Sequence, residues 1–153
     1  MLKKIKAKHI VVIAVLIVIF ALLSNGGSAE KSARKFVENM LDGRARECVS
    51  LLTDDAVEQT GYTRKVLISV MDGALEQMRE DYKSKYGKRW KYKITVIDSY
   101  EFEAEYYAGE RIGNAVTVVV GIQHTGSATE DEETETLVLI KDGRKWLVAG
   151  FGF

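Results

Sequence analysis

The chain has 153 residues, and its 22 Lys and Arg balance 22 Asp and Glu, so the formal net charge is zero. It has no basic excess with which to hold phosphate backbones, which excludes a nucleic-acid-binding role. Its single cysteine, Cys48, has no second cysteine to pair with, which excludes an internal disulfide.

The first 29 residues have the pattern of a membrane-targeting leader. Residues 10–23 are an unbroken apolar run, residues 24–29 are small or polar, and no acidic residue precedes Glu30. Lysine-rich flanks stay on the cytoplasmic side of a membrane. We therefore expect residues 30–153 to lie outside it as one domain, with a net charge of about −4. Four lysines precede the apolar run: Lys3, Lys4, Lys6 and Lys8.

Two fates of the leader, residues 1–29, stay open. The apolar run of 14 residues makes a helix of about 21 Å, shorter than the ~30 Å hydrocarbon core, and small residues follow it, which favours a cleaved signal peptide. The density of Ile and Val, and a helix extended through residues 24–29, favour a retained single-span anchor. The domain is thus expected at the cell membrane, single-pass with its C-terminal part outside, or secreted.

Three helices are predicted after the leader. The first carries an apolar stripe and ends before Gly43, and the second covers residues 45–52. Cys48 lies on the stripe of the second helix and is expected to be a buried structural thiol. The third helix begins after the N-cap Thr63 and runs to Gly87. Its outer face alternates in charge, as a solvated surface does: Glu76, Arg79, Glu80, Asp81, Lys83 and Lys85.

The remaining chain has the two-residue period of strands. Residues 90–106 alternate with a phase slip near Asp98, as in one strand with a bulge or two strands with a bend. Residues 115–123 are predicted to form a central strand covered on both faces, and residues 127–135 an acidic loop. Two closing strands over residues 136–140 and 146–153 then form a hairpin across Asp142-Gly143.

This order of elements predicts an α+β fold. N-terminal helices pack on a curved, mainly antiparallel sheet of four to five strands, preceded by one N-terminal hydrophobic helix. The last strand is expected to close the core, with Trp146 and Val148 facing the helices or with Leu147, Phe151 and Phe153 doing so.

Residues 36–45 (FVENMLDGRA), 48–55 (CVSLLTDD) and 141–148 (KDGRKWLV) resemble segments of nuclear-transport-factor-2-like domains, also called cystatin-like or cone-shaped. In order of elements, the resemblance covers residues 30–153 and extends to small bacterial exported proteins of this plan. It implies a curved sheet around a long helix, with a conical pocket. Ketosteroid isomerases and scytalone-dehydratase relatives place an Asp or His base and Tyr donors in that cone.

No residue of this chain is assigned to catalysis, cofactor binding or metal binding. Asp98, which interrupts an apolar strand, is the nearest match to a catalytic acid and is interpreted as a bulge residue facing water. His124 is interpreted as an exposed strand end. It is not assigned to zinc, because a zinc site needs three or four ligands. The acidic residues 130–135 lack the spacing of a calcium loop.

These observations favour a non-enzymatic, extracytoplasmic binding or scaffold domain, membrane-tethered or secreted. The alternative is a small-molecule-binding pocket domain with lyase or isomerase activity. The expected partners are the membrane, through the N-terminal segment, and a protein or a small hydrophobic ligand. A hollow cone with converging polar groups would favour the alternative, and a filled cone with an exposed apolar patch would favour the binding role.

Overall fold

The computed structural model describes residues 28–103, 114–127 and 129–152. The predicted leader, apart from its last two residues, lies outside this part, as do residues 104–106 of the alternating segment and Phe153. The helices come first and the strands follow. They are α2 (Ala29–Leu41), α3 (Ala45–Ser50), α4 (Asp54–Gln59), α5 (Arg64–Tyr86), β1 (Lys91–Glu103), β2 (Asn114–Thr125), β3 (Glu130–Asp142) and β4 (Lys145–Gly152).

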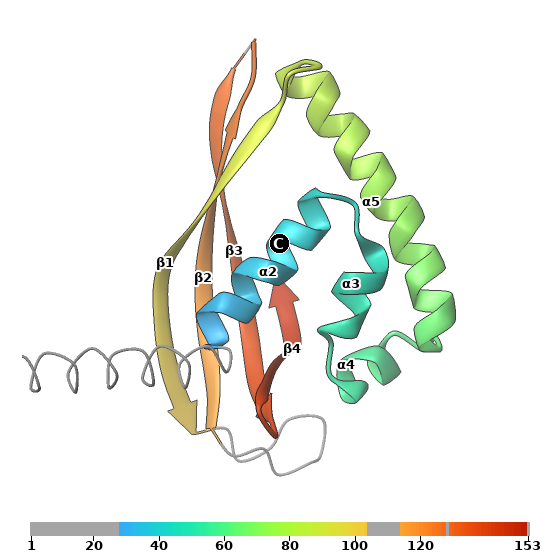
Figure 1. Ribbon diagram of the computed structural model, residues 1–153, viewed down its shortest axis with the longest axis vertical. Coiled ribbons are helices and arrows are strands. Elements are labelled where there is room, and N and C mark those ends of the chain that lie inside the picture. Colours follow the sequence, from blue (N-terminus) through green and yellow to red (C-terminus); the bar gives the residue numbers. More distant parts are fainter. Residues whose placement is uncertain (1–27, 104–113, 128, 153) are drawn as a thin grey trace, which may run out of the picture.

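The described strands form one antiparallel sheet in the order β1-β2-β3-β4, so the fold is α+β with four strands in a meander. α2 lies across one face of the sheet and contacts all four strands. α3 and α4 lie beside it, and α5 is the outer helix, whose C-terminal end comes back to the sheet (Figure 1).

Side-chain caps set the starts of three helices. The Ser28 hydroxyl accepts a hydrogen bond from the Lys31 N–H at the start of α2, and Thr63 accepts one from the Val66 N–H at the start of α5. Thr53 caps α4 in the same way. A short polar side chain at this position satisfies one of the N–H groups that a helix start leaves unpaired. The predicted Thr63 cap is therefore confirmed, whereas α4 was not predicted.

The core lies between α2 and the sheet. Val116 and Val118 of β2 stand opposite Leu139 and Leu137 of β3, and all four point at the helices. Burial of such side chains supplies most of the favourable free energy of folding. Side chains of α2 and α3 that complete the core are Ala33, Phe36, Val37, Met40, Leu41, Ala45, Cys48 and Val49.

The structure corrects one sequence prediction about the strands and decides between the alternatives of two others. The segment expected to be an acidic loop is the first half of β3, which pairs with β2 from Glu130 onward. The phase slip is a bulge between Val96 and Asp98, and beyond it Tyr100 is exposed on the face of the sheet away from the helices. Of the two alternatives for the last strand, the structure favours the one with Val148, which is fully buried in the core. Phe151 is 42% exposed, although its ring centroid lies 5.3 Å from that of Phe36.

Candidate functional site

Apolar side chains of α2 and of the sheet pack into the core between them. Phe36 and Val118 are fully buried there. Cys48, as predicted, is buried as well, and its Sγ lies 3.9 Å from the carbonyl oxygen of Phe36. Burial, with the charge of the neighbouring Glu47 as a smaller cause, raises the pKa of the Cys48 thiol to about 12. At neutral pH this thiol is not the thiolate that a nucleophile requires.

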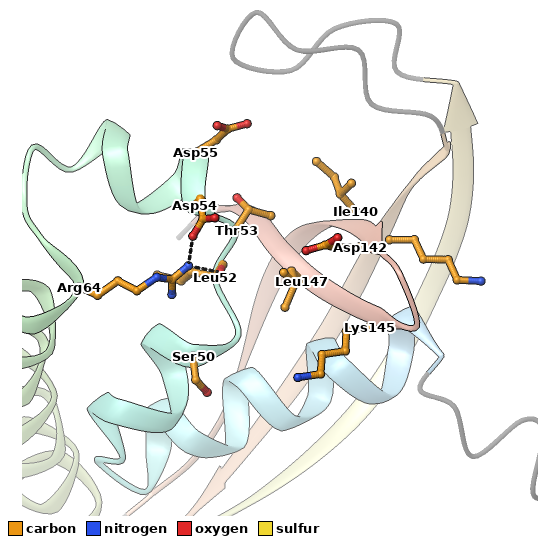
Figure 2. A pocket seen from close by; sticks show the side chains of 11 residues that line it. Ser50, Leu52, Thr53, Asp54, Asp55, Arg64, Ile140, Asp142, Lys145 and Leu147 are labelled. Carbon is orange, nitrogen blue, oxygen red and sulfur yellow. Dashed lines mark hydrogen bonds and ion pairs between the residues drawn. The ribbon is translucent and has the colours of Figure 1, made fainter.

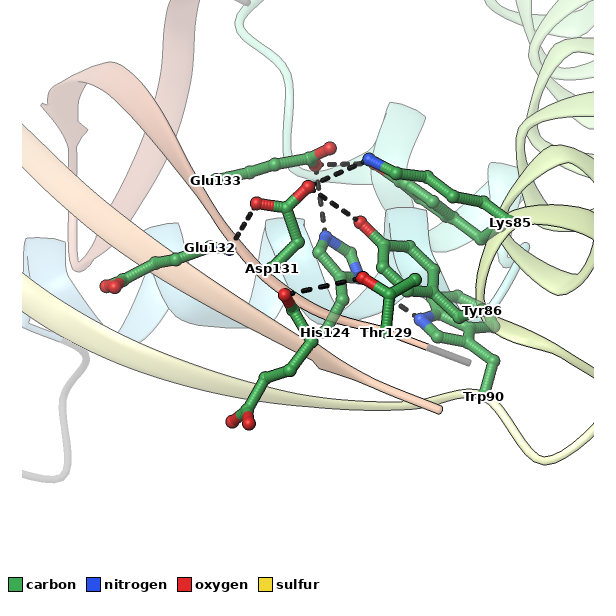
Figure 3. Close-up of polar contacts among 10 residues, drawn as sticks. Lys85, Tyr86, Trp90, His124, Thr129, Asp131, Glu132 and Glu133 are labelled. Atoms are coloured by element: carbon green, nitrogen blue, oxygen red, sulfur yellow. Dashed lines mark hydrogen bonds and ion pairs between the residues drawn. The ribbon is translucent and has the colours of Figure 1, made fainter. Parts of the chain in front are cut away.

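An aromatic cluster joins the C-terminal end of α5 to the sheet (Figure 3). We use this name for Tyr82, Tyr86, Trp90, His124 and Glu133. The His124 ring is fully buried and stacks on Tyr86, with the ring centroids 5.1 Å apart and the planes 9° apart. The rings of Tyr82 and Trp90 lie 4.5 and 6.0 Å from it. His124 is therefore not an exposed strand end, and that prediction is wrong.

Both nitrogens of His124 have hydrogen-bond partners. The indole N–H of Trp90 donates to Nδ1 at 3.1 Å, and Nε2 lies 3.1 Å from Oε2 of Glu133. A nitrogen that accepts a hydrogen bond carries no proton, so the proton of the neutral ring sits on Nε2 and points at Glu133. No lone pair of the imidazole is left to take a proton from a substrate. In this arrangement His124 holds neighbouring side chains in place and does not act as a general base.

The carboxylates of β3 complete the contact with α5. Glu133 accepts a second hydrogen bond from the Tyr82 hydroxyl at 2.7 Å, and Asp131 pairs with Lys85 at 2.8 Å. Burial raises the pKa of Tyr82, and the hydrogen bond to Glu133 raises it further. Burial, together with repulsion from Glu133, raises the pKa of Glu135 to about 7.

The turn after β2 allows the end of α5 to come this close. A Cβ atom at Gly126 would lie 1.9 Å from the carbonyl oxygen of Tyr86, so only glycine fits there. Together with the polar contacts, this close approach makes the aromatic cluster a structural joint between α5 and the sheet.

A charged groove lies at the other end of the molecule, between the α3–α4 connection and the β3–β4 hairpin (Figure 2). Its volume is about 510 Å³. Arg64, at the start of α5, is fixed there by the carbonyls of Val49 and Leu52, at 2.8 and 3.2 Å, and by Asp54 at 2.6 Å. Side chains of both charges line the groove: Asp54, Asp55, Arg64, Lys141, Asp142 and Lys145.

Next to the charged groove lies an apolar groove of about 410 Å³ between α4, α5 and the end of β4. Leu52 lines both. Leu67 and Met71 form the wall contributed by α5, with Gln59 and Thr60 as polar neighbours. The other lining residues are Ala56, Ala149, Gly150 and Phe151.

Other apolar side chains at the start of α5 are exposed without lining the groove. Val66 and Val70 precede Leu67 and Met71 in the helix, and therefore lie about 100° further around its axis. They are 45% and 47% exposed, and Tyr62, just before the helix, is 48% exposed. Large apolar side chains that cluster at a groove mark an interaction surface far more often than scattered ones do.

The structure brings neither Asp98, Cys48 nor His124 into the apolar groove. Asp98 is exposed beside the β1 bulge, as predicted, and Cys48 lies in the core. The groove residues themselves were missed. The helical period places Val70 on the inward-facing stripe of the third predicted helix together with Leu67 and Met71, but the structure leaves Val70 47% exposed.

No protein-family model, no curated protein and no solved structure matches this chain. Within residues 28–103, 114–127 and 129–152, no helix is both long enough and apolar enough to span a membrane. The same residues contain no cluster of three His, Cys, Asp or Glu side chains able to hold a metal ion.

Proposed function

We propose that residues 30–153 form a nuclear-transport-factor-2-like domain that acts outside the membrane as a binding or scaffold module. The α+β order, with α2 laid across an antiparallel sheet, supports this fold. The engagement of both His124 nitrogens supports a binding role over catalysis at this residue. The proposal that the leader directs export rests on its lysines and its apolar run.

The apolar groove is the observation that carries the binding role. We assign it to the apolar side chains of a partner protein. Protein interfaces combine an apolar centre with a polar rim, and here a groove with charges of both signs borders the apolar one at Leu52. The exposed side chains of Tyr62, Val66 and Val70 widen the apolar centre beyond the groove itself.

The start of α2 supports retention of the leader as an anchor. Ser28 caps this helix, and Ala29, its first residue, is 6% exposed. A cut after Ala29 would remove the cap and one buried side chain from the domain. Loss of such a cap costs ~1 kcal/mol, so cleavage there would weaken the helix that holds the core together.

Site-specific photocrosslinking in the cell envelope tests the groove. A photoreactive residue at Val70 of the full chain is expected to give a discrete crosslinked protein. The Val66→Glu substitution, which places a charge beside it, should abolish that product. A photoreactive residue at Glu76, on an exposed polar part of α5, is the matched control and should give no such product.

Two outcomes would contradict the proposal. Equal crosslinking from positions 70 and 76 would show that the groove has no preferred partner. A product that persists in Val66→Glu would show that the apolar surface does not hold it. Export is tested separately: a reporter enzyme active only in the cytoplasm, fused after residue 153, should be inactive.

A further inference from the structure

A cationic pocket of about 410 Å³ lies between the C-terminal end of α2, α5 and the start of β1. It gathers four cations and a single acid, although the domain as a whole carries net negative charge. Aromatic rings form part of its wall. The lining residues are Leu41, Asp42, Arg79, Lys83, Lys88, Trp90, Lys91 and Tyr92.

The acid of the pocket does not neutralise these cations. One oxygen of Asp42 is paired with Arg44 at 2.7 Å, and the other accepts a hydrogen bond from the Tyr92 hydroxyl. Lys83 is the one cation of the pocket with a carboxylate partner among the described residues, Glu80 at 2.6 Å. The charges of the other three cations are not balanced by any described carboxylate within ion-pair distance: Arg79, Lys88 and Lys91.

The Nε atom of Arg79 is buried and has no hydrogen-bond partner among the described residues. Its side chain lies against Gly43, where an added Cβ would be 3.1 Å from Cδ and 3.2 Å from Nη1. Gly43 also has φ of +72°, a conformation that glycine adopts without strain. Burying part of a charged group without a partner costs free energy, and an anion bound beside the guanidinium would offset that cost through its charge.

We propose that this cationic pocket binds an oxyanion, a carboxylate or a phosphate group, carried by a small molecule with an aromatic or apolar body. The planar guanidinium of Arg79 suits the two oxygens of such a group, and Lys88 and Lys91 add positive charge beside it. Trp90 and Tyr92 form the wall against which the body packs. The volume lies within the range of ligand pockets and exceeds what a bare inorganic ion fills.

Calorimetric titration of the full chain in a non-ionic detergent tests this inference. The probes are phenyl phosphate, benzoate and inorganic phosphate, all at one ionic strength. We expect phenyl phosphate and benzoate to bind at least tenfold more tightly than inorganic phosphate. Arg79→Gln should weaken both by at least tenfold, and Arg79→Lys by less. Quenching of Trp90 in a Trp146→Phe background would place the ligand in this pocket.

Arg46→Gln is the matched control, because it removes the same charge from an exposed position on α3 and should leave the affinities unchanged. Equal losses in the Arg79 and Arg46 variants would mean that only overall charge matters, and would overturn the proposal. So would unchanged binding by Arg79→Gln. Without ligand, Arg79→Gln should melt no lower than the wild type. A clear drop in its melting temperature would show that Arg79 is structural and would overturn the proposal as well.

Discussion

The two halves of α5 differ in what their side chains contact. In the C-terminal half, Tyr82, Lys85 and Tyr86 reach the sheet through hydrogen bonds, an ion pair and ring stacking. In the N-terminal half, Leu67 packs into the core while Val66 and Val70 remain about half exposed. One helix is therefore joined to the sheet at one end and presents apolar surface at the other. This difference separates residues that maintain the fold from residues that are free to bind.

The largest effect is expected from Tyr86→Ala in the joined half. Tyr86 is fully buried against His124 and the Gly126 turn. Removal of a buried aromatic ring costs ~3–5 kcal/mol, comparable to much of a domain's net stability. Urea denaturation followed by circular dichroism measures the loss. Tyr86→Phe, which keeps the ring, is the control and should cost less than ~1 kcal/mol. A similar cost for both variants would show that the ring packing is not what holds α5.

The next prediction concerns pH and Glu135, which faces the same joint. Its pKa rises from 4.5 to about 7 on folding, so the folded state holds this proton more tightly than the unfolded state does. Stability is then lost as the pH rises from about 4.5 to 7, and stays lower above that range. Glu135→Gln removes this titration. The variant should gain stability relative to the wild type at pH 8 and little at pH 4.5.

Urea titrations at the two pH values measure that difference. Glu132→Gln, on the exposed face of the same strand, is the control and should show no such pH-dependent gain. If Glu135→Gln gains equal stability over the wild type at both pH values, the charge of the Glu135 carboxylate is not the cause of that gain.

The sequence predicted those parts of the fold that depend on local patterns. The stripe ending at Gly43, the cap at Thr63 and the hairpin at Gly143 each involve residues within a few positions of one another. Residues 127–135 were predicted to form a loop because their composition is acidic, and that prediction is wrong. Strand pairing instead turns Glu133 and Glu135 toward α5, and pairing depends on residues far away in the chain.

The sites were harder to predict for the same reason. His124 is buried by Tyr82 and Trp90, which precede it by 42 and 34 residues. No pattern in the sequence near His124 indicates these contacts. Arg79 was interpreted as part of a solvated charged face. Its Nε is buried, and its side chain lies against Gly43 at the end of a different helix. Only the folding of the whole chain brings these residues together.

A smaller effect is expected at the cap of α5. Thr63→Ala removes the hydroxyl that accepts the Val66 N–H, a hydrogen bond of 3.3 Å, and should cost ~1 kcal/mol. Thr63→Ser keeps the hydroxyl and should be close to the wild type. The comparison uses thermal or urea denaturation. Because the cap lies in the half of α5 that borders the apolar groove, an unchanged stability would show that this end is already frayed.

The smallest effect on stability is expected from Val66→Ser combined with Val70→Ser. This double variant is also the sharpest test of the difference between the two halves of α5. Both side chains are about half exposed, and Val and Ser have similar helix propensities, so the free energy of unfolding should stay within ~0.5 kcal/mol. Leu67→Ser, one position along the same helix, removes a side chain that is 6% exposed and should be strongly destabilising. The double variant should also bind less of an apolar fluorescent dye than the wild type does. If it instead unfolds as readily as Leu67→Ser, the two valines belong to the core, and the apolar surface assigned to a partner does not exist.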